Sequence, residues 1–229
     1  MKSKISFIQV AAVIAVVMGV LYLSIGVNYL FMPEMQKEYL SPEFWPSFAE
    51  KPVPGYVQSI LFTLIAFLSL GLMPIVTTLA GGKITRFLRW IMLLGMLGYV
   101  VHAVEELRSM AITTRIADAY VQGDEATKSA ITALGLQHLD PLHIFKFGLV
   151  GLWIFIVDIV GLTKKTFPAG LAVVGIIGAV AFWINLVGNV IQAVGLVTAA
   201  SIAAIVLGPI WFVWMGIVIS KKAEQIDPG

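Results

Sequence analysis

The sequence contains no cysteine and few charged residues. The absence of cysteine from its 229 residues excludes disulfides, thiolate catalysis and metal sites built on cysteine. Charged residues make up 12% of the chain, whereas soluble domains carry about 25%. The formal net charge of +2 is too small to indicate a nucleic-acid partner. We therefore expect this chain to fold in lipid rather than in water.

The sequence also lacks the short motifs of common enzyme classes. It has no Gly-x-Ser-x-Gly elbow, no His-Glu-x-x-His zinc motif and no Gly-x4-Gly-Lys phosphate loop. Glu105 and Glu106 resemble the glutamate pair of intramembrane proteases that process prenylated proteins. Those proteases need an arginine four residues after the second glutamate, where this chain has Met110. No internal repeat is visible, so an inverted-repeat transporter gains no support.

What the sequence has instead is a series of long apolar runs. These runs cover about residues 5–32, 56–80, 87–112, 141–162, 169–197 and 200–220. Each run exceeds the roughly 20 residues that cross a bilayer. Because backbone groups in lipid must bond within the protein, the runs are expected to be helices. We predict an all-α polytopic membrane protein, with six transmembrane helices in one domain over residues 1–229.

The distribution of lysine and arginine predicts the orientation of these helices. One side of the membrane receives Lys2, Lys4, Lys83, Arg86, Arg89, Lys164, Lys165, Lys221 and Lys222. The other side receives only Lys37, Lys51, Arg115 and Lys128, together with eight acidic residues. Because cytoplasmic loops are enriched in positive residues, both termini are predicted to be cytoplasmic. The membrane is then a bacterial inner (cytoplasmic) membrane or a plasma membrane. The acidic outer loops are read as a solvated surface that mildly favours cations.

Two outer loops are expected to carry structure of their own. The aromatic and proline-rich segment Pro33–Gly55 is predicted to form an ordered hairpin or interfacial segment that caps the bundle. The segment Thr113–Asp140 is predicted to be partly helical, with Asp124 capping a short helix. In the first run, Ala11, Ala15 and Gly19 recur at helical spacing, a pattern that lets helices approach closely.

Ionisable and amide side chains gather at similar depth on three of the predicted helices. His102 shares a helix face with Glu105 and Glu106, while His143 and Lys146 share a face at the start of the fourth helix. Asn185, Asn189 and Gln192 have the spacing of one stripe on the predicted fifth helix. Polar groups at membrane depth are costly and usually face the protein interior. We predict an outward-facing pocket whose ligand-binding residues are His102, Glu106, Lys146, Asn185, Asn189 and Gln192.

Several interpretations of this polar cluster stay open. The simplest is a set of structural ion pairs, Glu106 with Lys146 and Glu105 with Arg108. A second is a site for a divalent transition metal, because imidazole and carboxylate ligands suit zinc, iron, copper or manganese. Its ligands would be His102, Glu105, Glu106 and His143, joined by His138 or Asp140. A third is a haem b held by His102 and His143. A fourth is a pocket for a lipid headgroup, a quinone or another small amphipathic molecule.

Three further residues are expected to have ordinary structural roles. His138 and Asp140 lie in the loop before the fourth helix and are read as surface residues unless they join a metal site. Asp158 lies near the inner end of the fourth helix and is expected to pair with Lys164, Lys165 or Arg89.

The leading functional hypothesis is non-enzymatic. The chain would bind a small molecule or lipid in the polar pocket, or serve as an accessory subunit beside other membrane subunits or in a homo-oligomer. The alternative is a metal-dependent or haem-containing membrane enzyme or redox protein that uses the cluster of histidines and glutamates. A small-solute transporter is the third hypothesis.

Three stretches of the second half carry a family resemblance. They are the segment Tyr120–Asp124, the run Phe145–Thr163 with the basic loop to Pro168 and Gly170, and the closing segment Gly208–Gly216. Together they resemble a bacterial multi-pass membrane family catalogued as domain of unknown function 4386. The chain departs from that family in having Ala169 where a charged residue often follows the proline. The resemblance implies six helices and no established activity.

Overall fold

The structure, a computed structural model, describes residues 7–37, 41–135 and 138–226, with side chains as far as residue 223. Within these ranges every element of secondary structure is a helix. Six segments are long and apolar enough to cross a membrane, which confirms the predicted all-α polytopic fold. They are α1 (Phe7–Phe31), α4 (Val53–Gly81), α5 (Arg86–Gln122), η1 with α7 (Ile144–Leu149 and Val150–Thr163), α8 (Ala169–Val190) and α9 (Val194–Ile226).

Most of the helix ends lie within a few residues of the predicted ones, and the predicted start at residue 5 lies outside the described residues. Four ends differ by more, two of them on α9, which covers Val194–Ile226 instead of about 200–220. Helix α5 has 37 residues and continues to Gln122 instead of ending near 112. At 1.5 Å per residue it is about 55 Å long, so it extends well beyond a hydrocarbon core of about 30 Å.

Helix α8 ends earlier than predicted, at Val190 rather than near 197. The turn to α9 places Gln192 in the left-handed region, with φ of 56°. Gly188 allows the two helices to close on each other, because a Cβ at this position would lie 2.9 Å from Cγ2 of Val197. The turn was missed because the residues on both sides of it are apolar, so the hydropathy of the sequence does not fall there.

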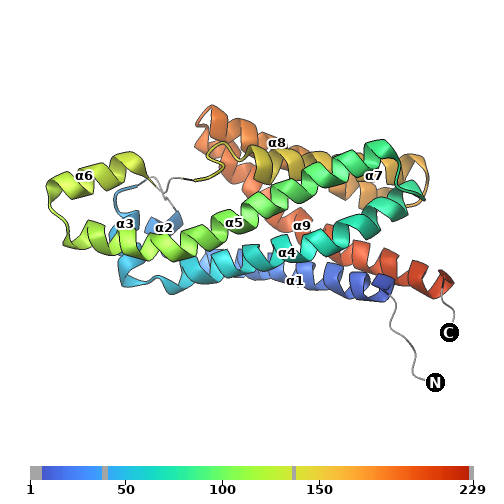
Figure 1. The fold of residues 1–229 in the computed structure, drawn as a ribbon, viewed down its shortest axis with the longest axis horizontal. Coiled ribbons are helices and arrows are strands. Elements are labelled where there is room, and N and C mark those ends of the chain that lie inside the picture. The colour runs from blue at the N-terminus through green and yellow to red at the C-terminus, as the bar shows by residue number, and fades with distance from the viewer. Residues whose placement is uncertain (1–6, 38–40, 136–137, 227–229) are drawn as a thin grey trace, which may run out of the picture.

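The six spans form a ring in which each helix packs on its neighbours. Helix α1 packs on α4 and α9, α9 on α8, α8 on α7, and α7 on α4 and α5. The start of α1 and the end of α9 lie at the same end of the bundle (Figure 1). The opposite end carries the short helices α2 (Glu34–Lys37), α3 (Phe44–Glu50) and α6 (Glu125–Leu134), and we call it the capped end.

Small residues let α1 and α9 pack closely, as their spacing in α1 predicts. A Cβ on Gly19 would lie 2.5 Å from Cγ2 of Val213 and 3.2 Å from the carbonyl oxygen of Pro209. Ala11 and Ala15 are completely buried on the same helix. The small-residue stripe of α1 therefore serves packing inside this bundle.

The half of the bundle nearest the termini is filled by large side chains, among them Met73, Trp153, Trp211 and Met215. The indole of Trp153 donates to the hydroxyl of Thr77 at 3.0 Å. This half of the bundle is therefore a packed core.

Asp158 is fully buried in this packed half, and its predicted pairing with a basic residue is wrong. The indole N–H of Trp211 donates to both carboxylate oxygens of Asp158, at 3.2 and 3.1 Å. The Lys164 ammonium instead donates to the carbonyl oxygen of Gly81 at 2.6 Å. Lys164 follows the end of α7 and reaches the neighbouring helix end, whereas Asp158 faces the bundle interior.

The described parts of the two long loops lie at the capped end, where Pro33–Gly55 was predicted to cap the bundle and Thr113–Asp140 to be partly helical. Phe44, Trp45 and Phe48 of α3 pack with Ala117 on the extension of α5. Asp124 is the N-cap of α6 and accepts the backbone N–H of Thr127 at 2.9 Å. The extension of α5 is therefore the platform on which the short helices rest.

Candidate functional site

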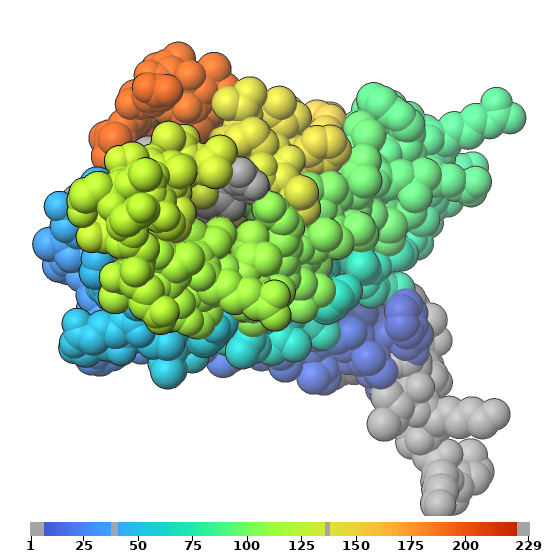
Figure 2. All heavy atoms as spheres, turned by 60° about the vertical axis from the view of Figure 1, so that its left-hand side comes forward, coloured from blue at the N-terminus to red at the C-terminus, as the bar shows by residue number. Residues whose placement is uncertain are grey.

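The capped half of the bundle encloses a cavity of about 350 Å³. Its walls come from α1, α4, α5, η1, α8 and α9, while α2 and α3 contribute lining residues from the cap. In Figure 2, where the capped end is turned forward, α6 and the end of α5 form one side of this end and the start of α9 forms another. The wall is largely aromatic and aliphatic. The aromatic lining residues are Tyr22, Tyr29, Phe44, Phe48, Tyr56, Phe62, Tyr99, Phe147 and Phe182.

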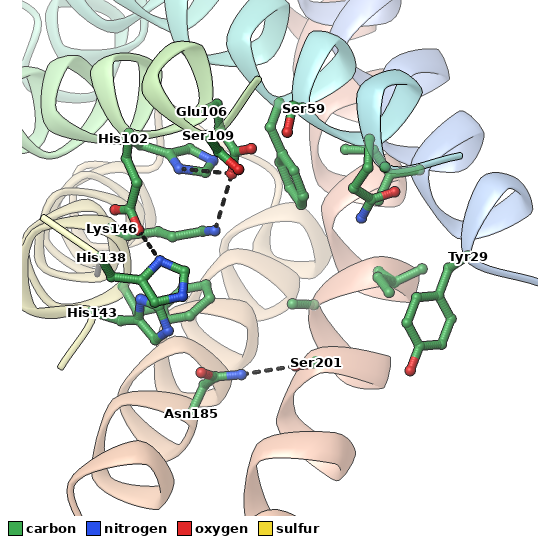
Figure 3. A pocket seen from close by; sticks show the side chains of 18 of the residues that line it. Tyr29, Ser59, His102, Glu106, Ser109, His138, His143, Lys146, Asn185 and Ser201 are labelled. Atoms are coloured by element: carbon green, nitrogen blue, oxygen red, sulfur yellow. Dashed lines mark hydrogen bonds and ion pairs between the residues drawn. The ribbon is translucent and has the colours of Figure 1, made fainter. Parts of the chain in front are cut away.

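The structure brings most of the predicted site residues together on this cavity. Its lining includes His102, Glu105 and Glu106 from α5, His143 and Lys146 from the start of the fourth span, and Asn185 and Asn189 from α8. Figure 3 shows His102, Glu106 and Lys146 directed toward one another, with Asn185 on the far side of the space. The prediction for Gln192 does not hold. Gln192 lies beyond the end of α8, is exposed and is absent from the lining.

Glu106 lies between two basic groups. Its Oε1 atom is 3.7 Å from Nδ1 of His102 and 3.7 Å from Nζ of Lys146. Both contacts are ion-pair distances that exceed the length of a hydrogen bond. The Lys146 ammonium also lies 4.8 Å from the ring centroid of Phe62 and 5.5 Å from that of Phe147. The structure therefore contains the predicted Glu106–Lys146 pair, and the same ammonium makes cation–π contacts.

Glu105 takes a partner that the sequence did not indicate. Nδ1 of His138 is hydrogen-bonded to Oε1 of Glu105, across 33 residues of sequence. His138 lines the cavity and is therefore more than the ordinary surface residue predicted for this position. Glu105 was expected to pair with Arg108, but the described ion pair of Glu105 is with His138. A loop residue can meet a helix in this way only through tertiary structure, so helical spacing could not reveal it.

Asp140 begins the helix that carries Lys146. Its side chain is only 3% exposed, and its carboxylate accepts the backbone N–H groups of Ile144, Phe145 and Lys146 at 2.8, 2.8 and 3.0 Å. These are donors that a helix start leaves without partners inside the helix. The expectation that Asp140 is a surface residue was wrong. An acid just before a predicted helix is a capping signal, and that signal was present in the sequence.

The helix start capped by Asp140 has unusual geometry. Residues Ile144–Leu149 form a π-helix, and His143 before it has a left-handed φ of 56°. Short π segments occur often at functional sites. The buried Nδ1 of His143 has no hydrogen-bond partner among the described residues.

The amide groups of α8 mainly tie α8 to α9. Nδ2 of Asn185 donates to Oγ of Ser201 at 2.8 Å and to the carbonyl oxygen of Val197 at 3.3 Å. Nδ2 of Asn189 donates to Oδ1 of Asn185 at 2.7 Å. Ser201 also lines the cavity, and sequence reasoning missed it because a lone serine in an apolar run carries little signal. These bonds satisfy the amide donors and leave a polar patch on the cavity wall.

The arrangement gives no support to the metal and haem hypotheses. Among the described residues there is no group of three or more histidine, aspartate and glutamate side chains that could hold a metal ion. The rings of His102 and His143 pack edge-on against Phe62 and Phe147, with centroids 5.1 and 5.3 Å apart. Each of these two imidazole rings therefore packs against a neighbouring phenylalanine ring.

Comparisons with protein-family models, curated proteins and solved structures found no match to this chain. The resemblance of its second half to the multi-pass family of unknown function stays a prediction. The function must therefore be argued from the site itself.

Proposed function

We propose that this protein binds one small amphipathic molecule in the cavity of its capped half. The observation that carries the proposal is the cavity itself, about 350 Å³ with a mainly apolar and aromatic wall and a few polar groups converging on it. Binding sites for small molecules typically have volumes of about 300–1,000 Å³ and this combination of wall and polar groups. The polar side chains would hold the ligand's head, and the rings would cover its apolar part.

A purely structural role for the polar residues explains less. Ion pairs such as Glu106–Lys146 neutralise charges that are costly in lipid, but they do not require empty space beside them. Protein interiors are normally packed with few voids larger than a water molecule. The other half of the same bundle follows that rule, because large side chains fill it. The ring centroids of Trp153 and Trp211, for example, lie 6.1 Å apart. The difference between the two halves supports a binding role for the capped half.

The side from which the ligand arrives follows from the charge distribution. With the positive residues on the cytoplasmic side, the termini are cytoplasmic and the capped end faces outward. The membrane would be an inner (cytoplasmic) or plasma membrane. The cavity would then receive a molecule from the external solution or the outer leaflet. Among the described residues of the packed half, the buried Asp158 and Thr77 are each bonded to a tryptophan of the core, so we favour binding over transport.

Filling the cavity tests this proposal. Ala204 lines the cavity, whereas its neighbour Ala203 does not. We would reconstitute wild type, Ala204→Leu and Ala203→Leu in lipid nanodiscs and measure binding of 4-phenylbutan-1-ol by equilibrium dialysis. Empty nanodiscs would correct for partitioning into lipid. Wild type and Ala203→Leu should each show one saturable site, and Ala204→Leu should lose it.

Two results would contradict the proposal. One is the absence of saturable binding to the wild-type chain. The other is equal binding by the two leucine variants, which would place the bound molecule elsewhere on the protein.

A further inference from the structure

Glu105 has a buried carboxylate oxygen that the protein leaves without a hydrogen-bond donor. The residue is 8% exposed, and its Oε1 is bonded to His138. Its Oε2 is buried and has no hydrogen-bond partner among the described residues. Buried polar groups are nearly always satisfied, and an exception in a native protein calls for an explanation. Glu105 lines the cavity, so this unsatisfied carboxylate belongs to the cavity wall.

Gln36 presents a second acceptor from the cap. Its Nε2 donates to the carbonyl oxygens of Ser47 and Lys51, both at 2.9 Å. These two acceptors fix the orientation of the amide, because an exchange of its oxygen and nitrogen would place oxygen against oxygen. The remaining Oε1 is buried and has no hydrogen-bond partner in the described part of the chain. Gln36 is 4% exposed and also lines the cavity, so the cap and the wall each offer an unused acceptor.

Two carboxylates are among the charged groups on the cavity wall. Glu105 and Glu106 line it together with the ammonium of Lys146, which pairs with Glu106, while the partner of Glu105 is the imidazole of His138. Lys37 also lines the cavity, but its ammonium is paired with Glu34 at 2.6 Å outside the lining. A carboxylate with an unbonded oxygen at membrane depth is costly, and a cation that enters the cavity would lower that cost.

The aromatic wall is already used to hold a cation. Lys146 places its ammonium over the rings of Phe62 and Phe147. Such contacts stabilise a desolvated cation by attraction to the ring face. Further rings line the same cavity, including Tyr56 and Tyr99. The wall therefore suits an organic cation with an apolar body better than it suits an anion.

We propose that the ligand is an amphipathic organic amine, whose protonated nitrogen donates to the free carboxylate oxygen of Glu105 while its apolar body lies against the aromatic wall. This inference rests on the proposed function and names the chemical class of its ligand. The loops of the outward face, which carry more acidic than basic residues, would favour the approach of a cation.

Three probes of the same shape separate charge from apolar binding. They are 4-phenylbutylamine, 4-phenylbutan-1-ol and 4-phenylbutyrate, which are cationic, neutral and anionic at pH 7. Dissociation constants would be measured by equilibrium dialysis on the full chain in nanodiscs of uncharged lipid. Hydrogen bonds to charged groups typically contribute enough for the amine to bind about tenfold more tightly than the alcohol. The anionic probe, 4-phenylbutyrate, should bind most weakly of the three.

Two variants assign the charge effect to one residue. Glu105→Gln keeps an oxygen for His138 and removes the charge, so the affinity for the amine should fall about tenfold toward that of the alcohol. Glu50→Gln is the matched control, because Glu50 is an exposed acid of the cap that does not line the cavity. It should leave all three affinities unchanged. Unaltered binding of the alcohol by Glu105→Gln would show that this variant is folded.

The outcomes distinguish the two proposals. Equal affinity of wild type for the three probes, or tighter binding of the butyrate, would overturn the amine inference and leave the binding cavity in place. If Glu105→Gln and Glu50→Gln lose amine binding equally, the loss would be attributed to the overall charge of the protein surface, and the amine inference would be overturned. The absence of saturable binding of every probe would instead overturn the proposed function.

Discussion

Replacing Asp140 by alanine should destabilise the protein more than any change to an exposed acid. The buried Asp140 carboxylate accepts three backbone N–H groups at the start of the π-helix, at 2.8 to 3.0 Å. A buried donor left without a partner costs about 1–3 kcal/mol, whereas loss of an ordinary N-cap costs about 0.5–2 kcal/mol. In Asp140→Ala all three N–H groups lose their acceptor at once, and local relaxation would recover part of the lost free energy. We expect the free energy of unfolding to fall by about 3 kcal/mol.

Two other substitutions, Asp140→Asn and Asp118→Ala, serve as controls for Asp140→Ala. Asp140→Asn keeps one acceptor oxygen and should cost about 1 kcal/mol. Asp118→Ala removes an exposed acid from the part of α5 that lies at the capped end, and its stability should stay within about 0.5 kcal/mol of wild type. The measurement is reversible unfolding in mixed micelles, followed by tryptophan fluorescence. An Asp140→Ala variant within about 0.5 kcal/mol of wild type would refute the capping argument.

Two further predictions concern packing and pH. A Cβ on Gly175 would lie 1.8 Å from Oδ2 of Asp158, so Gly175→Ala should cost about 1–3 kcal/mol of unfolding free energy. Gly178→Ala is the matched change on the same helix, because a Cβ there meets nothing within 4 Å, and equal costs in the two variants would contradict the packing account. Hydrogen bonds from Thr127 lower the pKa of the capping Asp124 below 3.8. The capping contribution is therefore present at neutral pH and is lost as the pH falls through the lowered pKa. Hydrogen exchange of α6 amides should show constant protection from pH 5 to 8 and weaker protection below about pH 4, and protection that first weakens near neutral pH would contradict this.

The sequence predicted the spans because a bilayer makes each one a run of apolar residues. It also predicted which helices bring polar side chains to the cavity. The spacing of His102 and Glu106 on α5, and of Asn185 and Asn189 on α8, placed these side chains on single faces that do line one cavity. In each case the decisive information is local, since a helix of known period determines which residues share a face.

The parts that could not be predicted depend on turns and tertiary contacts. Gln192 was misplaced because the α8–α9 turn lies within an apolar run. The bond between His138 and Glu105 joins a loop to a helix 33 residues away, and no periodic pattern reports such a contact. Gln36 reaches the cavity only because its amide is held by the backbone of the neighbouring cap segment. The size of the cavity is likewise a result of how six helices pack.

An experimental density map of the protein in lipid nanodiscs, prepared with 4-phenylbutylamine, tests the central claim most directly. We predict a single region of ligand density between the aromatic wall and Glu105, with the nitrogen within hydrogen-bond distance of the free carboxylate oxygen. A capped half closed by side chains, with no ligand density among the residues that line it here, would contradict the binding cavity.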